Sequence, residues 1–378
     1  MENRRRDPLF PTQLFHVGLA LDGVTTRLVI SLGKSPGSSY DRLGLVQFQT
    51  KSAPLRKPKE LSESARRSSK MRTASRIFSS VLAICACTAA QTSRTADASK
   101  VFAYDATKPL NLTIGNSETP TGGVTVFEIS YDSPKAGRVP GYLVVPPGKG
   151  PFPAIVYMHW GQGNKGEFLS EAVEMAQRGA IGIMIDAPYW RPDVPAPAKG
   201  NEAESERDQY IQMVVDLRRA VDLLVARKDV APDRIGYVGH SLGATWGAPL
   251  AAAEKRIKVF VLMGGLPRVP PNWDDDSFYQ QVQRASTPRA ELDKEAAVLG
   301  PIEPERFAAN TGPAKIYFQW AQHDMYISHS SADEYFNAVR GPKEQKWYFT
   351  SHEFNDTESK SDRASWLVHA LGINADAH

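Results

Sequence analysis

Cysteine is nearly absent from this chain of 378 residues, and its two cysteines, Cys85 and Cys87, lie together in one short apolar stretch. The sequence after residue 100 contains none, which excludes an internal disulfide, a thiol nucleophile and a thiolate metal site from that part of the chain. Long apolar runs are also missing, because the run around the two cysteines is too short to cross a bilayer. We therefore expect no stable membrane span.

Beyond residue 100, basic residues are outnumbered by acidic ones. The whole chain carries a formal net charge of +3, but residues 1–100 contain 17 Lys and Arg against only 7 Asp and Glu, so the remainder is net acidic. That remainder shows no basic patch of the kind that nucleic-acid binding requires. We expect no nucleic-acid partner, and the oligomeric state stays open.

The first ninety residues differ in composition from the rest. Residues 1–70 are rich in Arg, Ser, Pro and Lys, which indicates a disordered extension or a gene model that begins upstream of the true start at Met71. Residues 71–90 pass from a basic segment through a short apolar core to small residues, a pattern typical of a signal peptide. Lipidation of Cys87 is the alternative. We expect a secreted or periplasmic protein cleaved near Ala90.

The body of the chain, residues 100–375, alternates short apolar runs with helical patterns. This alternation predicts one α/β domain with a mostly parallel sheet and helices on both faces. The first two strands are joined by a short turn, which favours antiparallel pairing. The expected strands are 124–131, 139–145, 154–158, 181–185, 234–238, 257–263, 315–320 and 346–350. The expected helices are 168–178, 204–227, 242–254, 332–339 and 362–371.

A long interval, residues 264–313, separates two of the expected strands. Two helices are expected within it, at 274–284 and 289–299, and we predict a cap over the carboxyl edge of the sheet, where ligands bind in open α/β sheets. A crossover helix with surface decoration is the alternative. The interval contains the aromatic residues Trp273, Phe278 and Tyr279, which suggest an aromatic lining of a substrate pocket.

Ser241 lies at the centre of the most informative motif, Gly239-His240-Ser241-Leu242-Gly243. A G-x-S-x-G sequence between an apolar strand and a helix rich in small residues is typical of a nucleophile elbow. The tight turn requires small neighbours and exposes the serine hydroxyl at the carboxyl edge of the sheet. The motif therefore predicts Ser241 as a nucleophile.

A serine hydroxyl needs a base, and the base needs an acid that fixes its tautomer. Asp324 follows the expected strand 315–320 and His352 follows 346–350, so both belong at the edge where Ser241 lies. The order serine, acid, histidine also fits the fold. We predict Asp324 as acid and His352 as base, while Asp186, which precedes the serine, supports the site or caps the following turn. Six other histidines receive structural, surface, pocket-shaping or tail roles: His16, His240, His323, His329, His369 and His378.

An oxyanion hole needs two backbone N–H donors directed at the developing negative charge. Leu242, directly after the nucleophile, is predicted to supply one of them. The other is expected from the glycine-containing loop after strand 154–158, with Trp160 and Gly161 as the candidates.

These motifs, in this order, resemble the α/β-hydrolase superfamily, and within it the dienelactone-hydrolase-like and acetyl-xylan-esterase-like serine esterases. The resemblance covers about residues 100–375 and implies an α/β-hydrolase fold and a serine hydrolase with a Ser241–His352–Asp324 triad. The implied substrate is a small carboxylic ester, and no metal or organic cofactor is implied. Two positions differ from the family pattern: Ser241 stands where dienelactone hydrolases have cysteine, and Trp160 follows His159 where glycine is usual.

Two other functions stay open at this point. One is a peptidase or amidase of the prolyl-oligopeptidase type, which would use the same three residues on an amide bond. The other is a catalytically silent α/β-hydrolase fold that serves as a binding protein, because a fold by itself does not determine function.

Overall fold

A computed structural model of the chain describes residues 96–194, 197–269 and 275–373, together with the backbone of short strands between residues 13 and 49. The chain forms two compact units, Met1–Gln91 and Thr92–His378. In the first unit, β1 (Gln13–Leu21) pairs antiparallel with β2 (Val24–Gly33), which also pairs with β3 (Arg42–Leu43) and β4 (Gln47–Gln49). The signal-like segment 71–90, Trp273 and His378 lie outside the described residues.

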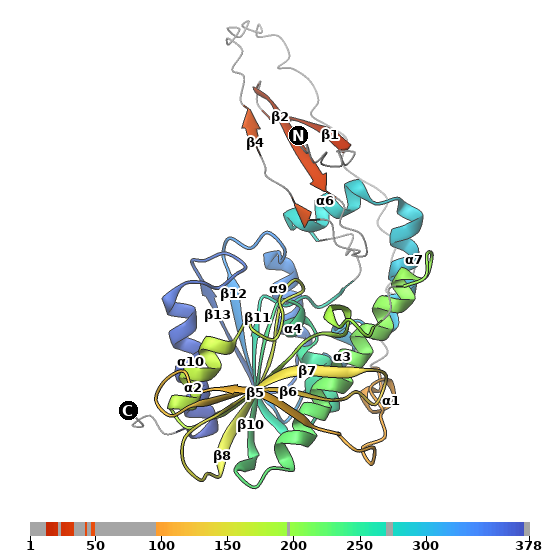
Figure 1. Cartoon of the computed structure of the whole chain (residues 1–378). Coiled ribbons are helices and arrows are strands. Elements are labelled where there is room, and N and C mark those ends of the chain that lie inside the picture. Colours follow the sequence, from red (N-terminus) through yellow and green to blue (C-terminus); the bar gives the residue numbers. More distant parts are fainter. Residues whose placement is uncertain are drawn as a thin grey trace, which may run out of the picture. The chain divides into compact units, whose positions relative to one another are not determined.

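The second unit is built on a nine-stranded sheet in the order β13-β12-β11-β10-β8-β9-β7-β6-β5 (Figure 1). The six strands from β13 to β9 are parallel, and the three at the other edge are antiparallel. The parallel strands are β8 (Phe152–Met158), β9 (Ile181–Ile185), β10 (Val230–His240), β11 (Ile257–Met263), β12 (Lys315–Ala321) and β13 (Lys343–Tyr348). The antiparallel strands are β5 (Thr113–Glu118), β6 (Thr125–Asp132) and β7 (Arg138–Val145). The predicted mostly parallel sheet and its antiparallel first pair are thus confirmed.

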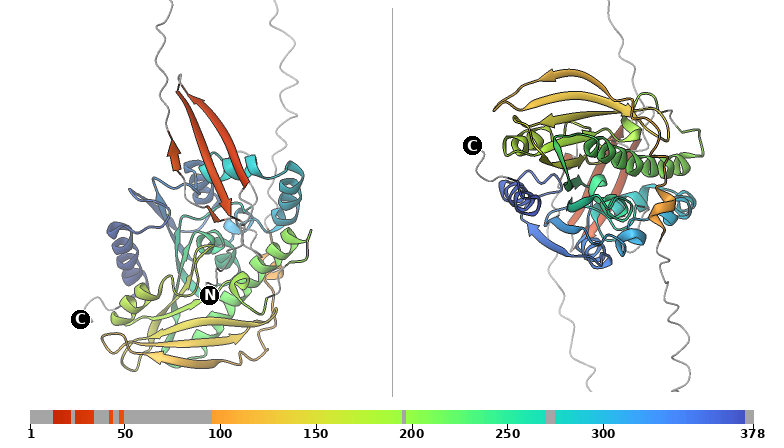
Figure 2. Two further views of the ribbon diagram at one scale, coloured as in Figure 1. Left: turned by 45° about the horizontal axis from the view of Figure 1, so that its top comes forward. Right: turned by 90° about the horizontal axis from the view of Figure 1, so that it is seen from below.

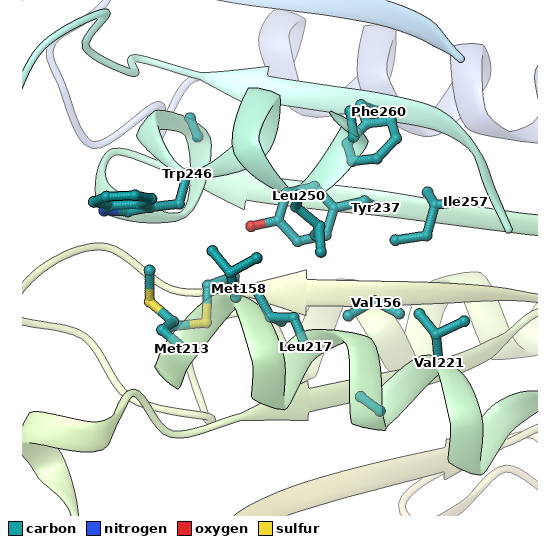
Figure 3. Close-up of a cluster of buried hydrophobic side chains, with 14 of the residues drawn as sticks. Val156, Met158, Met213, Leu217, Val221, Tyr237, Trp246, Leu250, Ile257 and Phe260 are labelled. Atoms are coloured by element: carbon teal, nitrogen blue, oxygen red, sulfur yellow. The ribbon is translucent and has the colours of Figure 1, made fainter. Parts of the chain in front are cut away.

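Helices cover both faces of this sheet (Figures 1 and 2). The long α3 (Glu202–Val225) lies on one face, and α2 (Leu169–Gln177) and α10 (Thr357–Leu371) lie on the other. Figure 3 shows Val156 and Met158 of β8 directed at α3. The alternating residues of the same strand, Ile155 and Tyr157, join the core under α2 and α10. Burial on both sides explains why these strands are almost continuously apolar in sequence.

The interval predicted as a cap contains α6 (Phe278–Ser286), α7 (Arg289–Leu299), η2 (Gly300–Ile302) and α8 (Glu305–Ala308). Helix α6 begins where Ser277 caps it, because the serine side chain accepts a hydrogen bond from the Gln280 N–H at 3.3 Å. Helix α7 packs against α3. Shorter elements of the same unit are α1 (Ala98–Val101), η1 (Pro188–Trp190) and α9 (His329–Ala338).

The helix predicted over 242–254 is divided in two, α4 (Leu242–Thr245) and α5 (Gly247–Ala253), with the break at Trp246. Pro249 explains where the break falls. A proline has no N–H for the carbonyl four residues earlier and its ring clashes with that carbonyl, which here belongs to Thr245. The hydroxyl of Tyr335 donates instead to the Thr245 oxygen at 2.8 Å.

Other boundaries also differ from the sequence prediction. Strand β13 begins at Lys343 and ends at Tyr348, whereas the apolar pattern predicted 346–350. Helix α10 begins at Thr357 because Asp356 caps it, accepting a hydrogen bond from the Ser359 N–H at 2.7 Å. Among the described residues, no helix is both long and apolar enough to cross a bilayer.

Candidate active site

Ser241 adopts a strained backbone conformation between β10 and α4, with φ 51° and ψ −105°. Positive φ is costly for a residue with a side chain and is found mainly where the surrounding structure enforces it. The Ser241 N–H donates to the Met263 carbonyl at 2.7 Å. A Cβ added at Gly243 would lie 2.4 Å from the Met158 carbonyl oxygen, so only glycine fits there. The chain therefore makes the sharp strand-to-helix turn that the motif predicts.

Asp324 and His352 lie together beyond the ends of β12 and β13. The Nδ1–H of His352 donates to Oδ2 of Asp324 at 2.7 Å, and both side chains are almost wholly buried. The other carboxylate oxygen accepts hydrogen bonds from the N–H groups of Tyr326 (2.8 Å) and Ile327 (3.0 Å). This carboxylate holds the imidazole in the tautomer whose Nε2 can accept a proton.

Two contacts bring the loop of His352 to the turn that carries Ser241. His240, the residue before the serine, donates from Nε2 to the His352 carbonyl oxygen at 2.7 Å. Met263, whose carbonyl binds the Ser241 N–H, is followed by Gly264. The His352 ring lies close against Gly264, because a Cβ added there would be only 3.3 Å from Nδ1 of His352. The structure thus gathers the three predicted residues at one edge of the sheet.

The loop after β8 holds the two candidates for the second oxyanion donor. The Trp160 N–H donates to Oε2 of Glu167 at 2.8 Å. In this conformation it therefore already has an acceptor and is not free to bind an oxyanion. That leaves Gly161, which is partly exposed, as the candidate in this loop. Asp186 contacts this loop, because its Oδ1 accepts a hydrogen bond from the Lys165 N–H at 2.7 Å.

An aromatic wall adjoins His352. The ring of Tyr326 lies 4.7 Å from the His352 ring between centroids, and the ring of Tyr279 lies 5.2 Å from that of Tyr326. Tyr279 belongs to α6, and its N–H donates to the Met325 carbonyl at 2.9 Å. Burial is the main cause that raises the pKa of both phenols, that of Tyr279 to about 12. The segment between β11 and β12 therefore reaches the histidine through Tyr279, whose ring lies at a tilt against that of Tyr326.

The remaining histidines divide by exposure. His323, His329 and His369 are exposed. His240 and His159 are buried, and desolvation lowers the pKa of His159.

Sequence reasoning missed Glu167 and Tyr326 as parts of this site. The only available signal for Glu167 was its place at the end of the glycine-rich loop that follows β8.

Comparison with known proteins extends these observations. A sequence model of the family described as acetyl xylan esterase (AXE1) matches residues 99–367. The chain belongs to the acetyl xylan esterase family. The acetyl xylan esterase of Paenibacillus sp. R4 superposes with a TM-score of 0.59 at 19% identity, covering 72% of this chain and 92% of that one. Acetyl xylan esterase 1 of Thermoanaerobacterium sp. JW/SL YS485 superposes at 0.61 with 16% identity, covering 74% and 92%.

Matches to curated sequences are shorter. The bile acid-CoA:amino acid N-acyltransferase of Mus musculus is 29% identical over 131 residues, 35% of this chain and 28% of that protein. The chain spans between 28% and 47% of the length of four curated relatives. Family and architecture together confirm the predicted α/β-hydrolase fold and its likeness to acetyl xylan esterases, a family of ester-bond hydrolases.

Proposed function

We propose that this chain is a serine esterase that hydrolyses a small carboxylic ester through an acyl-enzyme. One observation carries the proposal: His352 is held by Asp324 at 2.7 Å, next to a strained turn with Ser241 at its apex. A buried carboxylate, a histidine and a serine at a strand-to-helix turn are what acyl transfer to a hydroxyl needs. The family, whose description names acetyl xylan esterase, supports an acetyl ester as the first substrate to test.

The proposed reaction has two halves. Ser241 Oγ attacks the ester carbonyl carbon while Nε2 of His352 takes the hydroxyl proton, and the N–H groups of Leu242 and Gly161 hold the oxyanion. The C–O bond to the alcohol then breaks as His352 returns the proton to the leaving oxygen. Water repeats the sequence on the acyl-enzyme, giving a carboxylic acid and free Ser241. Asp324 keeps the imidazole oriented and stabilises its transient positive charge.

The test combines active-site labelling with turnover. The full chain is incubated with a fluorophosphonate probe and, separately, with 4-nitrophenyl acetate, beside the variants Ser241→Ala, Asp324→Asn and, as control, the exposed Ser361→Ala. We expect Ser241→Ala to lose both signals and Ser361→Ala to keep them. Asp324→Asn should lower kcat by about 10³–10⁴-fold, because an amide favours the wrong imidazole tautomer.

Three results would contradict the proposal. Labelling or turnover that survives in Ser241→Ala would remove the serine from the mechanism. Turnover of peptides without turnover of esters would favour an amidase. A folded wild-type chain that takes no label would favour the binding-protein alternative.

A further inference from the structure

His240 faces hydrogen-bond acceptors on both sides of its ring. Nε2 lies 2.7 Å from the His352 carbonyl oxygen, and Nδ1 lies 2.6 Å from Oε1 of Glu167. A carbonyl oxygen has no proton to give, so Nε2 must carry one. In a neutral ring Nδ1 would then present a lone pair to a carboxylate oxygen. The contact at 2.6 Å therefore requires one more proton than a neutral histidine and a carboxylate hold together.

The surroundings place that proton on the histidine. Glu167 also accepts the Trp160 N–H through Oε2 at 2.8 Å, and hydrogen bonds of this kind favour the ionised form of a carboxylate. The His240 side chain is 6% exposed and that of Glu167 20%, so the pair is little screened by water. The arrangement is that of an imidazolium that donates from both nitrogens, once to a carboxylate and once to a carbonyl.

The same carboxylate fixes the loop that offers the oxyanion donor. The Trp160 indole stacks on the His240 ring, 6.3 Å between centroids and 22° between planes. The carbonyl of Trp160 accepts from Nδ1 of His159 at 2.6 Å, and the other nitrogen of His159 accepts the Ala187 N–H at 3.0 Å. This carbonyl and the N–H of Gly161 belong to one planar trans peptide, so fixing the carbonyl sets the direction of that N–H.

We propose that His240 and Glu167 form a charged clamp that positions the Trp160–Gly161 loop and the His352 loop around Ser241. The inference rests on the proposed serine mechanism and assigns both residues as positioning residues. Neither is assigned a contact with substrate. The clamp connects the turn before the nucleophile, the oxyanion loop and the main chain of the base, which are otherwise far apart in sequence. The clamp holds the oxyanion donor and the base at the distances that acyl transfer needs. Small displacements of these groups would lower the reaction rate.

The extra proton holds the clamp closed, because without it two acceptors would face each other at 2.6 Å. Phe354 packs edge-on against the His240 ring, 5.9 Å between centroids. The charged or titratable groups that act on the pair are His352, Glu353, His159 and Tyr189.

Two variants at Glu167 separate charge from position. In Glu167→Gln the amide oxygen can accept the Trp160 N–H and the amide N–H can donate to Nδ1 of a neutral His240, so the contacts persist without the extra proton. Glu167→Ala removes both contacts. We expect Glu167→Ala to lower kcat for 4-nitrophenyl acetate by about 10²-fold with KM within about threefold of wild type. Glu167→Gln should recover at least tenfold of that loss.

An independent measurement reads the proton directly. Nitrogen-15 NMR of the histidine-labelled full chain at pH 7, with the His240 signals assigned by their loss in His240→Gln, should show both ring nitrogens protonated in wild type. In Glu167→Gln only one should be protonated. A neutral His240 ring in wild type, or a Glu167→Gln variant no more active than Glu167→Ala, would overturn the clamp. Failure of the serine mechanism is seen separately, as activity or labelling that survives in Ser241→Ala.

Discussion

The hydroxyl of Tyr335 offers a sharp test of how the turn after Ser241 is stabilised. Tyr335 lies in α9, is fully buried, and donates to the Thr245 carbonyl at 2.8 Å with the Ala244 carbonyl at 3.1 Å as a second acceptor. It also accepts the Ala248 N–H at 3.1 Å. These backbone groups lie where Pro249 interrupts the helical hydrogen bonds. One side-chain oxygen thus joins the two short helices that follow Ser241.

Substitution of Tyr335 by Phe keeps the ring and removes only this oxygen. One buried carbonyl and one buried N–H then lose their partner, and each such loss costs about 1–3 kcal/mol. The packing contribution is unchanged because the ring stays. We therefore expect the free energy of unfolding to fall by about 2–6 kcal/mol, a large share of the roughly 5–15 kcal/mol that is typical of folded domains.

Urea unfolding followed by tryptophan fluorescence measures this change as a lower midpoint with an unchanged slope. Tyr142→Phe is the matched control, since Tyr142 is half-buried on β7, and its free energy of unfolding should stay within about 0.5 kcal/mol of wild type. A Tyr335→Phe variant as stable as this control would refute the idea that the hydroxyl replaces the helical hydrogen bonds lost at the proline.

Two further predictions concern stability. A methyl group at Gly243 would lie 2.4 Å from the Met158 carbonyl oxygen, so Gly243→Ala should destabilise the fold by about 3 kcal/mol and reduce turnover. In the same urea titration the control Gly300→Ala should be as stable as wild type, because nothing lies within 4 Å of a methyl group there. Burial and a neighbouring carboxylate in α3 raise the pKa of Glu295 from 4.5 to about 7. The folded state therefore binds the carboxyl proton of Glu295 more tightly than the unfolded state does. The stability that this proton contributes is fully present below pH 4.5 and is lost as the pH rises through 7. Glu295→Gln should therefore unfold at the same urea concentration as wild type at pH 4.5 and be more stable by on the order of 1 kcal/mol at pH 8, while the exposed Glu291→Gln should show no such difference.

Much of the site could be predicted from sequence because its residues follow apolar strands. Asp324 and His352 come after β12 and β13, and parallel strands bring their carboxyl ends to one edge, so the pairing of these side chains follows from topology. The expectation held although β13 ends at Tyr348, two residues earlier than predicted. A loop can absorb such a shift in a strand boundary. Export through residues 71–90 stays a prediction, since that segment lies outside the described residues.

Other features depend on contacts that no local pattern encodes. Glu167 belongs to a turn before α2 and meets His240 only because β8 and β10 are neighbours in the sheet. Strand β5 was missed because all its residues are exposed, so it lacks the apolar alternation that marks a half-buried strand. Pro249 was visible in sequence and marks where the helix divides, but the hydroxyl that binds the freed Thr245 carbonyl belongs to Tyr335, which a distant helix contributes.

The two histidines near Ser241 have opposite proton requirements, and their partners explain how both can be met. The rings of His240 and His352 lie only 5.2 Å apart between centroids. Each has its own carboxylate on Nδ1, Glu167 in one case and Asp324 in the other. They differ at Nε2. That of His240 is bound to a carbonyl, which demands a proton, whereas His352 must present a free lone pair there to act as a base. The proposed clamp and base therefore need different proton states at Nε2, and the different partners of the two rings allow both states side by side.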